Sequence, residues 1–338
     1  MRTWLASLRV ALVAASLGVV THTWALTPPE INVATAYAAD NFQTRNLQRY
    51  AEEVLQATGG KVIIKVHPAG SLIKPAQIFT GVREGRAQGG EVIMSSLAKE
   101  IPLFGMDALP FIVSGYADAR TMWEVSRAAV DAALAARGMK LLYAVPWPPQ
   151  SLYSRTPINV PDDFAGLRMR AYNPATERIA QLVHAKPVTI QVVDLANAVA
   201  QGQVDLMITS SWTGVETKAW TRLLHYYKVS AWIPKNVVFL DKALFDTLDA
   251  ASRTTLLELA RSAEARGWKM SEDSDREYEA QLAAHGIEVA SMDFFVRRHL
   301  DRIGETLARE WLREAGSDEL QVLLHYMAER SRQHASAR

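Results

Sequence analysis

The sequence predicts an α/β protein of two lobes, each built on a mixed, mostly parallel sheet with flanking helices. Strand-like and helix-like segments alternate along the chain, which is the pattern of parallel strands joined by right-handed crossovers. A chain of 338 residues is long enough for two domains of ordinary size. One helical pattern in the C-terminal third is too long to cover a single small lobe, so we expect it to lie across both.

The first half of the chain supplies the elements of one lobe. Short apolar and β-branched runs predict strands at residues 31–36, 61–66, 91–94 and 140–145. Apolar residues at three- and four-residue steps predict helices between them, at residues 44–57, 76–84 and 117–136. Trp147, Pro148 and Pro149 come next. Because proline restricts its own backbone and that of its predecessor, they predict a rigid, extended connector to a second lobe.

Residues 162–209 repeat this order as strand, helix, strand, helix, strand. The strand-like run 167–170 ends in Arg170, and Pro174 fits the first turn of the helix that follows. The apolar run 204–208 is of strand length. Arg170 therefore lies at the carboxyl end of a strand, where open α/β sheets bind ligands.

Residues 250 to about 282 carry the long helical pattern, which contains no proline. A helix of that length covers roughly 40 Å at about 1.5 Å per residue. We expect the chain to cross between the lobes near residues 148 and 235 and within this helix. The expected boundaries are residues 26–148 with about 236–277 for the first lobe, 149–235 with about 278–330 for the second, and a frayed polar tail at 331–338.

The first 25 residues have the composition of a secretory signal peptide. Arg2 and Arg9 are present without any acidic residue, an apolar run follows at 10–20, and the sequence T-W-A at 23–25 is an acceptable cleavage site. An uncleaved membrane anchor is the alternative. The apolar run is about half of the roughly 20 residues that a bilayer span needs, which favours cleavage and a periplasmic protein.

The composition excludes several function classes. Removing Arg2 and Arg9 with the leader leaves 35 basic and 36 acidic residues, so nothing suggests nucleic-acid binding. The chain has no cysteine, and none of its eight histidines has another histidine four residues away. No G-x-S-x-G, H-E-x-x-H, P-loop or G-x-G-x-x-G motif occurs. We therefore expect no catalytic residues, no cofactor and no metal site.

The order of motifs over residues 162–209 resembles that of the DctP-type solute-binding proteins of TRAP transporters. Their motif runs G-x-K-x-R, then a small residue with Pro-Val, then E-x-Y-x-A-L-x-x-G-x-V-D-G. Eight residues stand in matching places: Gly166, Arg170, Pro187, Val188, Ala198, Gly202, Val204 and Asp205. Four depart from it: Asp194, Ala196, Val199 and Leu206. The likeness extends to a YAADNF segment, a PAGSL turn at 68–72 and ALPFIVSGYADA at 108–119.

The resemblance implies a two-lobed periplasmic-binding-protein fold, type II-like, with a long helix bridging the lobes. It also implies a receptor that captures a small organic acid and delivers it to TRAP membrane permease subunits. In the matching family position, Arg170 pairs with the ligand carboxylate. A structural ion pair at the strand end is the alternative role for Arg170. An exported enzyme on a related α/β fold and a receptor feeding a signalling partner are the alternative functions.

Gln150 is the departure that bears most on the ligand. Many acid-sugar and dicarboxylate binders of this family carry a second arginine about 20 residues before the first, and Gln150 stands there. An amide has no charge, so a second buried carboxylate would lack its cation. We expect a monocarboxylate, with aromatic, 2-oxo and 2-hydroxy acids among the candidates; the alternative is that Gln150 is a solvated loop residue.

Other candidate ligand-binding residues follow from their places at strand ends. Thr209 occupies the position of a ligand-contacting Asn in the family, and Trp212 lies in the polar loop after it, although tryptophans are often packing residues. By the same topology, we expect these residues at the cleft: Tyr37, Asn41, Phe42, Ser95, Ser96, Trp147 and Tyr172.

The leader predicts where the mature chain begins. We expect the exported protein to start at or near Leu26, because the charged start, the apolar run and the cleavage pattern occur in the order that signal peptidase requires. Intact-mass measurement and N-terminal sequencing of protein from the periplasm check this. Retention of residues 1–25 would contradict it.

Overall fold

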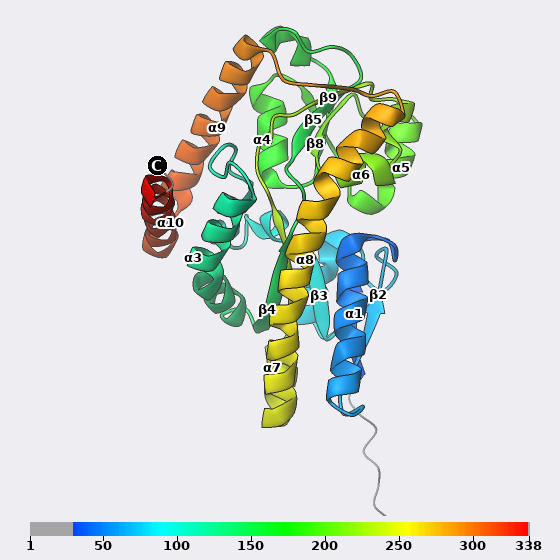
Figure 1. Ribbon diagram of the computed structural model, residues 1–338, viewed down its shortest axis with the longest axis vertical. Coiled ribbons are helices and arrows are strands. Elements are labelled where there is room, and N and C mark those ends of the chain that lie inside the picture. Colours follow the sequence, from blue (N-terminus) through cyan, green and yellow to red (C-terminus); the bar gives the residue numbers. More distant parts are fainter. Residues whose placement is uncertain (1–29, 337–338) are drawn as a thin grey trace, which may run out of the picture.

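The computed structural model describes residues 30–336, which form two lobes with one sheet each (Figure 1). The leader predicted at residues 1–25 and the start of the mature chain at Leu26 lie outside the described residues. The expected α/β architecture with two mixed sheets is confirmed.

Lobe I is built on a sheet with the order β2-β1-β3-β10-β4. Its strands are β1 (Glu30–Thr35), β2 (Ile63–His67), β3 (Gly89–Ile93), β4 (Met139–Pro146) and β10 (Lys235–Asp241). Its helices are α1 (Phe42–Ala57), α2 (Ile78–Arg83), α3 (Tyr116–Ala135) and the short η1 (Pro75–Gln77), η2 (Met94–Leu97) and η3 (Pro102–Ala108). The strand β1 runs parallel to β2 and β3, whereas β10 runs antiparallel to β3 and β4.

Lobe II is built on a sheet with the order β11-β9-β5-β8-β6-β7. Its strands are β5 (Ser151–Ser154), β6 (Arg168–Ala171), β7 (Lys186–Thr189), β8 (Leu206–Thr209), β9 (His225–Tyr227) and β11 (Glu288–Ala290). Its helices are α4 (Pro174–Leu182), α5 (Val192–Ala200), α6 (Ser211–Glu216) and the short η4 (Pro161–Phe164) and η5 (Ala219–Thr221). Here β5 is the antiparallel member, paired with β8 and β9.

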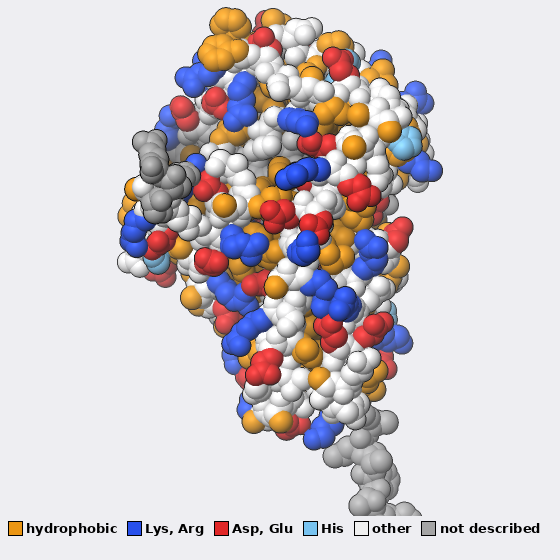
Figure 2. All heavy atoms as spheres, viewed as in Figure 1, with side chains coloured by type: hydrophobic (Ala, Val, Ile, Leu, Met, Phe, Trp, Pro, Cys, Tyr) orange, Lys and Arg blue, Asp and Glu red, His pale blue; other side chains and the backbone are white. Residues whose placement is uncertain are grey.

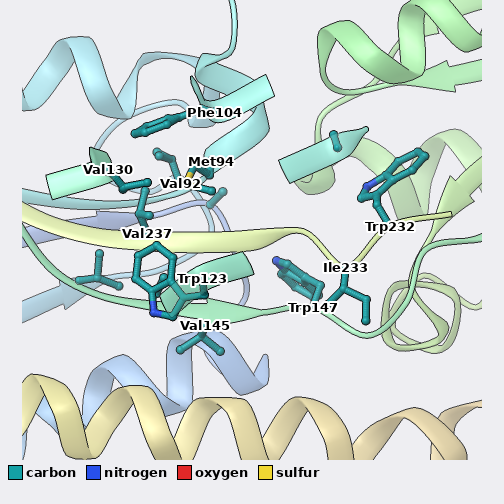
Figure 3. Packing of buried hydrophobic residues seen from close by; sticks show 14 of the residues in the cluster. Val92, Met94, Phe104, Trp123, Val130, Val145, Trp147, Trp232, Ile233 and Val237 are labelled. Carbon is teal, nitrogen blue, oxygen red and sulfur yellow. The ribbon is translucent and has the colours of Figure 1, made fainter. Parts of the chain in front are cut away.

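The two segments that cross between the sheets hydrogen-bond to each other. The amide of Trp147 donates to the carbonyl of Pro234 at 2.8 Å, and Gln150 and Trp232 are joined in the same way at 2.8 Å. Figure 3 shows Trp147, Trp232 and Ile233 where these segments leave the lobe I sheet, with α8 running alongside. We call these two paired crossing segments the hinge. The antiparallel strands β5 and β10 begin directly after it, one in each lobe.

The long helix α8 (Ala250–Ala284) follows the short α7 (Lys242–Thr247) and bridges the lobes, as expected (Figure 1). Asp249 caps its start by accepting the amide of Ser252 at 2.8 Å. The first half of α8 packs on α1 and β4, and the second half packs on α6 and β11. A helix this long therefore fixes the positions of both lobes relative to one axis.

After β11, which belongs to the sheet of lobe II, the chain returns to lobe I, which corrects our assignment of residues 317–330 to lobe II and of residues 331–336 to a frayed tail. After α9 (Phe294–Glu314), which touches η3 of lobe I and α4 of lobe II, helix α10 (Ser317–Ser336) packs on α3. Tyr326 is fully buried there, and its hydroxyl donates to the carbonyl of Ile112 at 3.0 Å. The polar side chains of α10 also find partners on lobe I: the guanidinium of Arg330 lies 3.1 Å from Asp118.

The surface carries charges of both signs, interspersed over the face shown in Figure 2. This matches the near balance of basic and acidic residues in the sequence. Within residues 30–336, no helix combines the length and the apolar character needed to cross a membrane.

Gly267 marks the closest approach of α8 to lobe I and gives a test of this packing. A methyl group at Gly267 would lie 2.4 Å from Val145 and 2.8 Å from the amide of Asn46. Gly267→Ala normally favours a helix by about 1 kcal/mol, but here the overlap is expected to lower the free energy of unfolding by about 1–3 kcal/mol. Urea unfolding measures this, with the exposed Ser262→Ala on the same helix as the control. A stabilised Gly267→Ala protein would contradict the packing.

Candidate functional site

A cavity of about 190 Å³ lies between the lobes. Lobe I contributes Tyr37 after β1, Glu91 on β3 and Ser96 on η2. Lobe II and the crossing segment contribute Trp147, Gln150, Arg170, Tyr172, Gln191 and Thr209. Apolar side chains such as Ile78, Phe79 and Val192 complete the lining. The carboxyl ends of strands from both lobes meet here, which is where this class of sheet binds ligands.

Arg170 reaches the cavity because of its register on β6. Side chains alternate along a strand, so Arg168 and Arg170 share one face, but Arg168 sits at the strand's start and Arg170 at its inner end. Arg168 makes two bonds of 2.8 Å to the carboxylate of Asp205 and is thereby used structurally. The guanidinium of Arg170 donates to the carbonyl of Ile190 at 3.1 Å and lies 4.8 Å from the ring centre of Tyr172.

Arg170 is a buried cation without a protein anion. Among residues 30–336, two cationic side chains are buried, Arg170 with 5% and Lys235 with 1% of its surface exposed. Lys235 is paired with the buried carboxylate of Asp107, whereas no described carboxylate lies within ion-pair distance of Arg170. Burial lowers the pKa of Arg170 to about 10, so the group stays charged at neutral pH. The structural ion pair that was the alternative role for Arg170 is therefore wrong.

Gln150 is buried, so its alternative reading as a solvated loop residue is wrong. Only 3% of its surface is exposed. Its amide nitrogen donates to the carbonyl of Pro148 at 2.8 Å, and its oxygen accepts from the hydroxyl of Tyr172 at 3.4 Å. Among the described residues that line the cavity, Arg170 is the one Lys or Arg, and Gln150 adds no charge beside it.

Aromatic rings and hydroxyls form the rest of the polar lining. The rings of Tyr37 and Trp147 lie 4.9 Å apart. Burial raises the pKa of Tyr172 to about 12 and that of Tyr37 further, so both phenols keep their protons. Thr209, at the end of β8, adds a hydroxyl from a side chain that is 4% exposed. The cavity thus offers one positive charge, several hydroxyls and flat apolar walls.

Four of the expected cleft residues lie outside the lining, in contacts between or behind the lobes. Asn41 caps α1 and donates to Glu216 of lobe II at 3.2 Å. Phe42 packs between Trp147 and Trp212, with ring centres 5.1 and 4.9 Å away. Ser95 accepts from the amide of Asn173 at 2.9 Å. The structure therefore places Asn41, Phe42, Ser95 and Trp212 where they hold the lobes together, which corrects the expectation that they face the cavity.

Glu91 is the charged lining residue that the sequence did not predict. It is 1% exposed on β3, and no described cation lies within ion-pair distance of it. Its position in the short apolar run 91–94 could have indicated a functional role. A charged residue in a buried strand needs polar partners from elsewhere in the protein or from a ligand.

The two arginines of β6 should have opposite effects on stability. Arg168→Met is expected to lower the free energy of unfolding by about 1 kcal/mol, because Asp205 loses its partner. Arg168 holds the pKa of Asp205 below its usual range, so this loss is present near neutral pH and disappears as the pH falls through that lowered pKa.

Arg170→Met removes a buried, unpaired cation and is expected to raise the free energy of unfolding by about 1 kcal/mol. Urea unfolding of protein refolded without added ligand measures both variants. A destabilised Arg170→Met protein would show that Arg170 is stabilised by the protein itself.

Comparison with known proteins agrees with this geometry. Residues 33–310 match the family DctP, described as bacterial extracellular solute-binding protein, family 7. A solute-binding protein of Albidiferax ferrireducens is 22% identical over 75% of this chain and 76% of its own.

Two solved structures are more similar. DctP6 of Bordetella pertussis, an extracytoplasmic solute receptor binding pyroglutamic acid, is 35% identical, covers 89% of this chain and 100% of its own, and superimposes with a TM-score of 0.86. A TRAP solute-binding protein from a marine metagenome, specific for pyroglutamate, is 34% identical, covers 89% of this chain and 99% of its own, and has a TM-score of 0.87. This chain therefore belongs to the DctP family of TRAP solute-binding proteins, which are extracytoplasmic receptors and not enzymes.

Proposed function

We propose that this protein is a periplasmic receptor for a small cyclic monocarboxylate of the pyroglutamate type, which it delivers to TRAP membrane permease subunits. The observation that carries the proposal is the guanidinium of Arg170, buried beside the cavity between the lobes without a protein anion. Leaving such a charge uncompensated costs several kcal/mol, and a ligand carboxylate that accepts two parallel hydrogen bonds removes that cost.

The lining supports one carboxylate and not two. Arg170 is the one Lys or Arg among the described lining residues, and Glu91 adds a negative group. A second ligand carboxylate would have to be buried near Gln150 or Glu91, without a cation in either place. Arg168 and Lys235, the other cations near the site, are already paired with Asp205 and Asp107.

The size and walls of the cavity support a compact ring. A volume of about 190 Å³ suits a small acid, and Tyr37, Trp147 and Tyr172 present flat faces. The two solved relatives at 34–35% identity are receptors for pyroglutamate, which is a five-membered ring with one carboxylate.

Lobe closure completes the site. Asn41 to Glu216 and Asn173 to Ser95 join the lobes around the cavity at 3.2 and 2.9 Å. Closing excludes water, which strengthens the pairing of Arg170 with a carboxylate. The closed surface is then what the permease would recognise, after export directed by the leader at residues 1–25.

The ligand class can be tested with a matched pair of acids. L-Pyroglutamate should bind, and glutarate, a diacid with the same number of carbons and no ammonium group, should bind at least about 10-fold more weakly because its second carboxylate finds no cation. Calorimetry on protein unfolded and refolded to remove bound solute measures both, and ligand at 100 times its dissociation constant should add about 2.7 kcal/mol to stability.

Gln150→Arg provides the control for that comparison. It supplies a second cation and is expected to narrow the gap between the two acids. Absence of pyroglutamate binding, or tighter binding of glutarate by the unmodified protein, would contradict the proposal.

A further inference from the structure

Glu91 is the second charged group of the cavity. It lies on β3 of lobe I, whereas Arg170 lies on β6 of lobe II, and the two do not form an ion pair. A carboxylate 1% exposed and without a cationic partner among residues 30–336 needs hydrogen-bond donors. The donors that it has determine what it can offer to a ligand.

The protein aims one donor at each oxygen of Glu91. The hydroxyl of Thr35 donates to Oε2 at 2.6 Å, and the amide nitrogen of Asn236 donates to Oε1 at 3.1 Å. The Thr35 hydroxyl oxygen itself receives the backbone amide of Tyr37 at 3.3 Å, so its proton is available to Glu91. Both oxygens of Glu91 are therefore acceptors.

The orientation of Asn236 is fixed by the indole of Trp147, which can only donate to it. The indole nitrogen of Trp147 donates to Oδ1 at 2.9 Å, and the hydroxyl of Tyr37 donates to the same atom at 3.2 Å. Because an indole N–H never accepts, the atom facing it must be the oxygen, and the amide nitrogen must face Glu91. This chain of four side chains holds Glu91 as an acceptor whichever ligand enters.

Glu91 still has acceptor capacity in the direction of the cavity. A carboxylate has about four lone-pair positions, and two are used. Burial raises the pKa of Glu91, while the bonds from Thr35 and Asn236 act in the opposite direction. An N–H group of a ligand could donate to a free lone pair of Glu91. A ring oxygen at the same place would be repelled, because its lone pairs would face those of the carboxylate.

We propose that Glu91 accepts a hydrogen bond from a ring N–H of the ligand, so that the receptor selects lactam carboxylates over lactone and carbocyclic acids of the same shape. The inference rests on the proposed function, in which Arg170 holds the carboxylate of the same ligand. Glu91 is then the specificity-determining residue and Arg170 the anchoring residue.

The test compares ligands that differ only at the ring nitrogen. L-Pyroglutamate is measured by calorimetry against 5-oxotetrahydrofuran-2-carboxylate, in which ring oxygen replaces N–H, and 3-oxocyclopentane-1-carboxylate, in which CH₂ replaces it. The wild-type protein is expected to prefer pyroglutamate by at least about 10-fold over each, since a charged acceptor left without its donor is costly. Equal affinities would overturn the inference while leaving the proposed function intact.

A variant separates ligand recognition from a structural role. Glu91→Gln keeps the size of the side chain and can still accept from Asn236, with its amide nitrogen turned towards the Thr35 hydroxyl. The preference for pyroglutamate over the lactone should fall at least several-fold. Glu264→Gln is the control, because Glu264 is a half-buried carboxylate of lobe I that accepts from the backbone amide of Ala144 at 2.9 Å and does not line the cavity; the preference of this variant should stay at the wild-type value.

An unchanged preference in a folded Glu91→Gln protein would overturn the inference. If that variant does not fold, the wild-type comparison of the three acids decides alone. Failure of pyroglutamate itself to bind would overturn this inference together with the proposed function, whereas binding of pyroglutamate and the lactone with equal affinity would overturn this inference only.

Discussion

A guanidinium enclosed between two lobes, with no carboxylate of the protein beside it, is unfavourable until an anion joins it. Arg170 is in this position, while Lys235, the other buried cation of the described chain, has Asp107. The closed arrangement is consequently most stable with an anionic solute inside. This couples recognition to closure, because the contact that favours the ligand is made only where both lobes exclude water.

The rest of the structure serves to hold that charge in place. The pair of Arg168 with Asp205 ties the start of β6 to the start of β8, so that the inner end of β6 delivers Arg170 to the cavity. The crossing segments around Trp147 and Trp232 hydrogen-bond to each other and form the hinge. Along one side of both lobes, α8 provides a rigid axis, and Gly267 lets it approach lobe I closely.

Much of this could be predicted from the sequence, because it depends on local patterns. The alternation of strands and helices, the long proline-free helix and the place of Arg170 at a strand end are all encoded within short windows. Gln150 was singled out through the resemblance, because it stands where many members of the family carry a second arginine. Trp212 and Phe42 were wrongly placed in the lining because topology tells which edge of a sheet a loop borders, but not whether its side chain points into the cavity or packs on a neighbour.

Features that depend on distant residues escaped prediction. The partners of Glu91 are Thr35 and Asn236, which lie 56 and 145 positions away in the chain, so nothing near Glu91 in the sequence indicates its role. The polar residues at the end of α10 predicted a frayed tail because the partners of this helix lie on α3, more than 200 positions earlier, as Arg330 meets Asp118. Burial of polar groups is decided by the assembled fold.

The most direct measurement of the central claim is the affinity of Arg170→Lys for L-pyroglutamate, determined by calorimetry beside the wild-type protein. An ammonium keeps the positive charge but cannot make two parallel hydrogen bonds to a carboxylate. We therefore expect the folded variant to lose about 2 kcal/mol of binding free energy, which is a roughly 30-fold weaker affinity. Arg222→Lys, at an exposed arginine of lobe II that donates to the carbonyl of Ala200 and does not line the cavity, should bind as the wild type does. Wild-type affinity in Arg170→Lys would show that Arg170 does not hold the ligand.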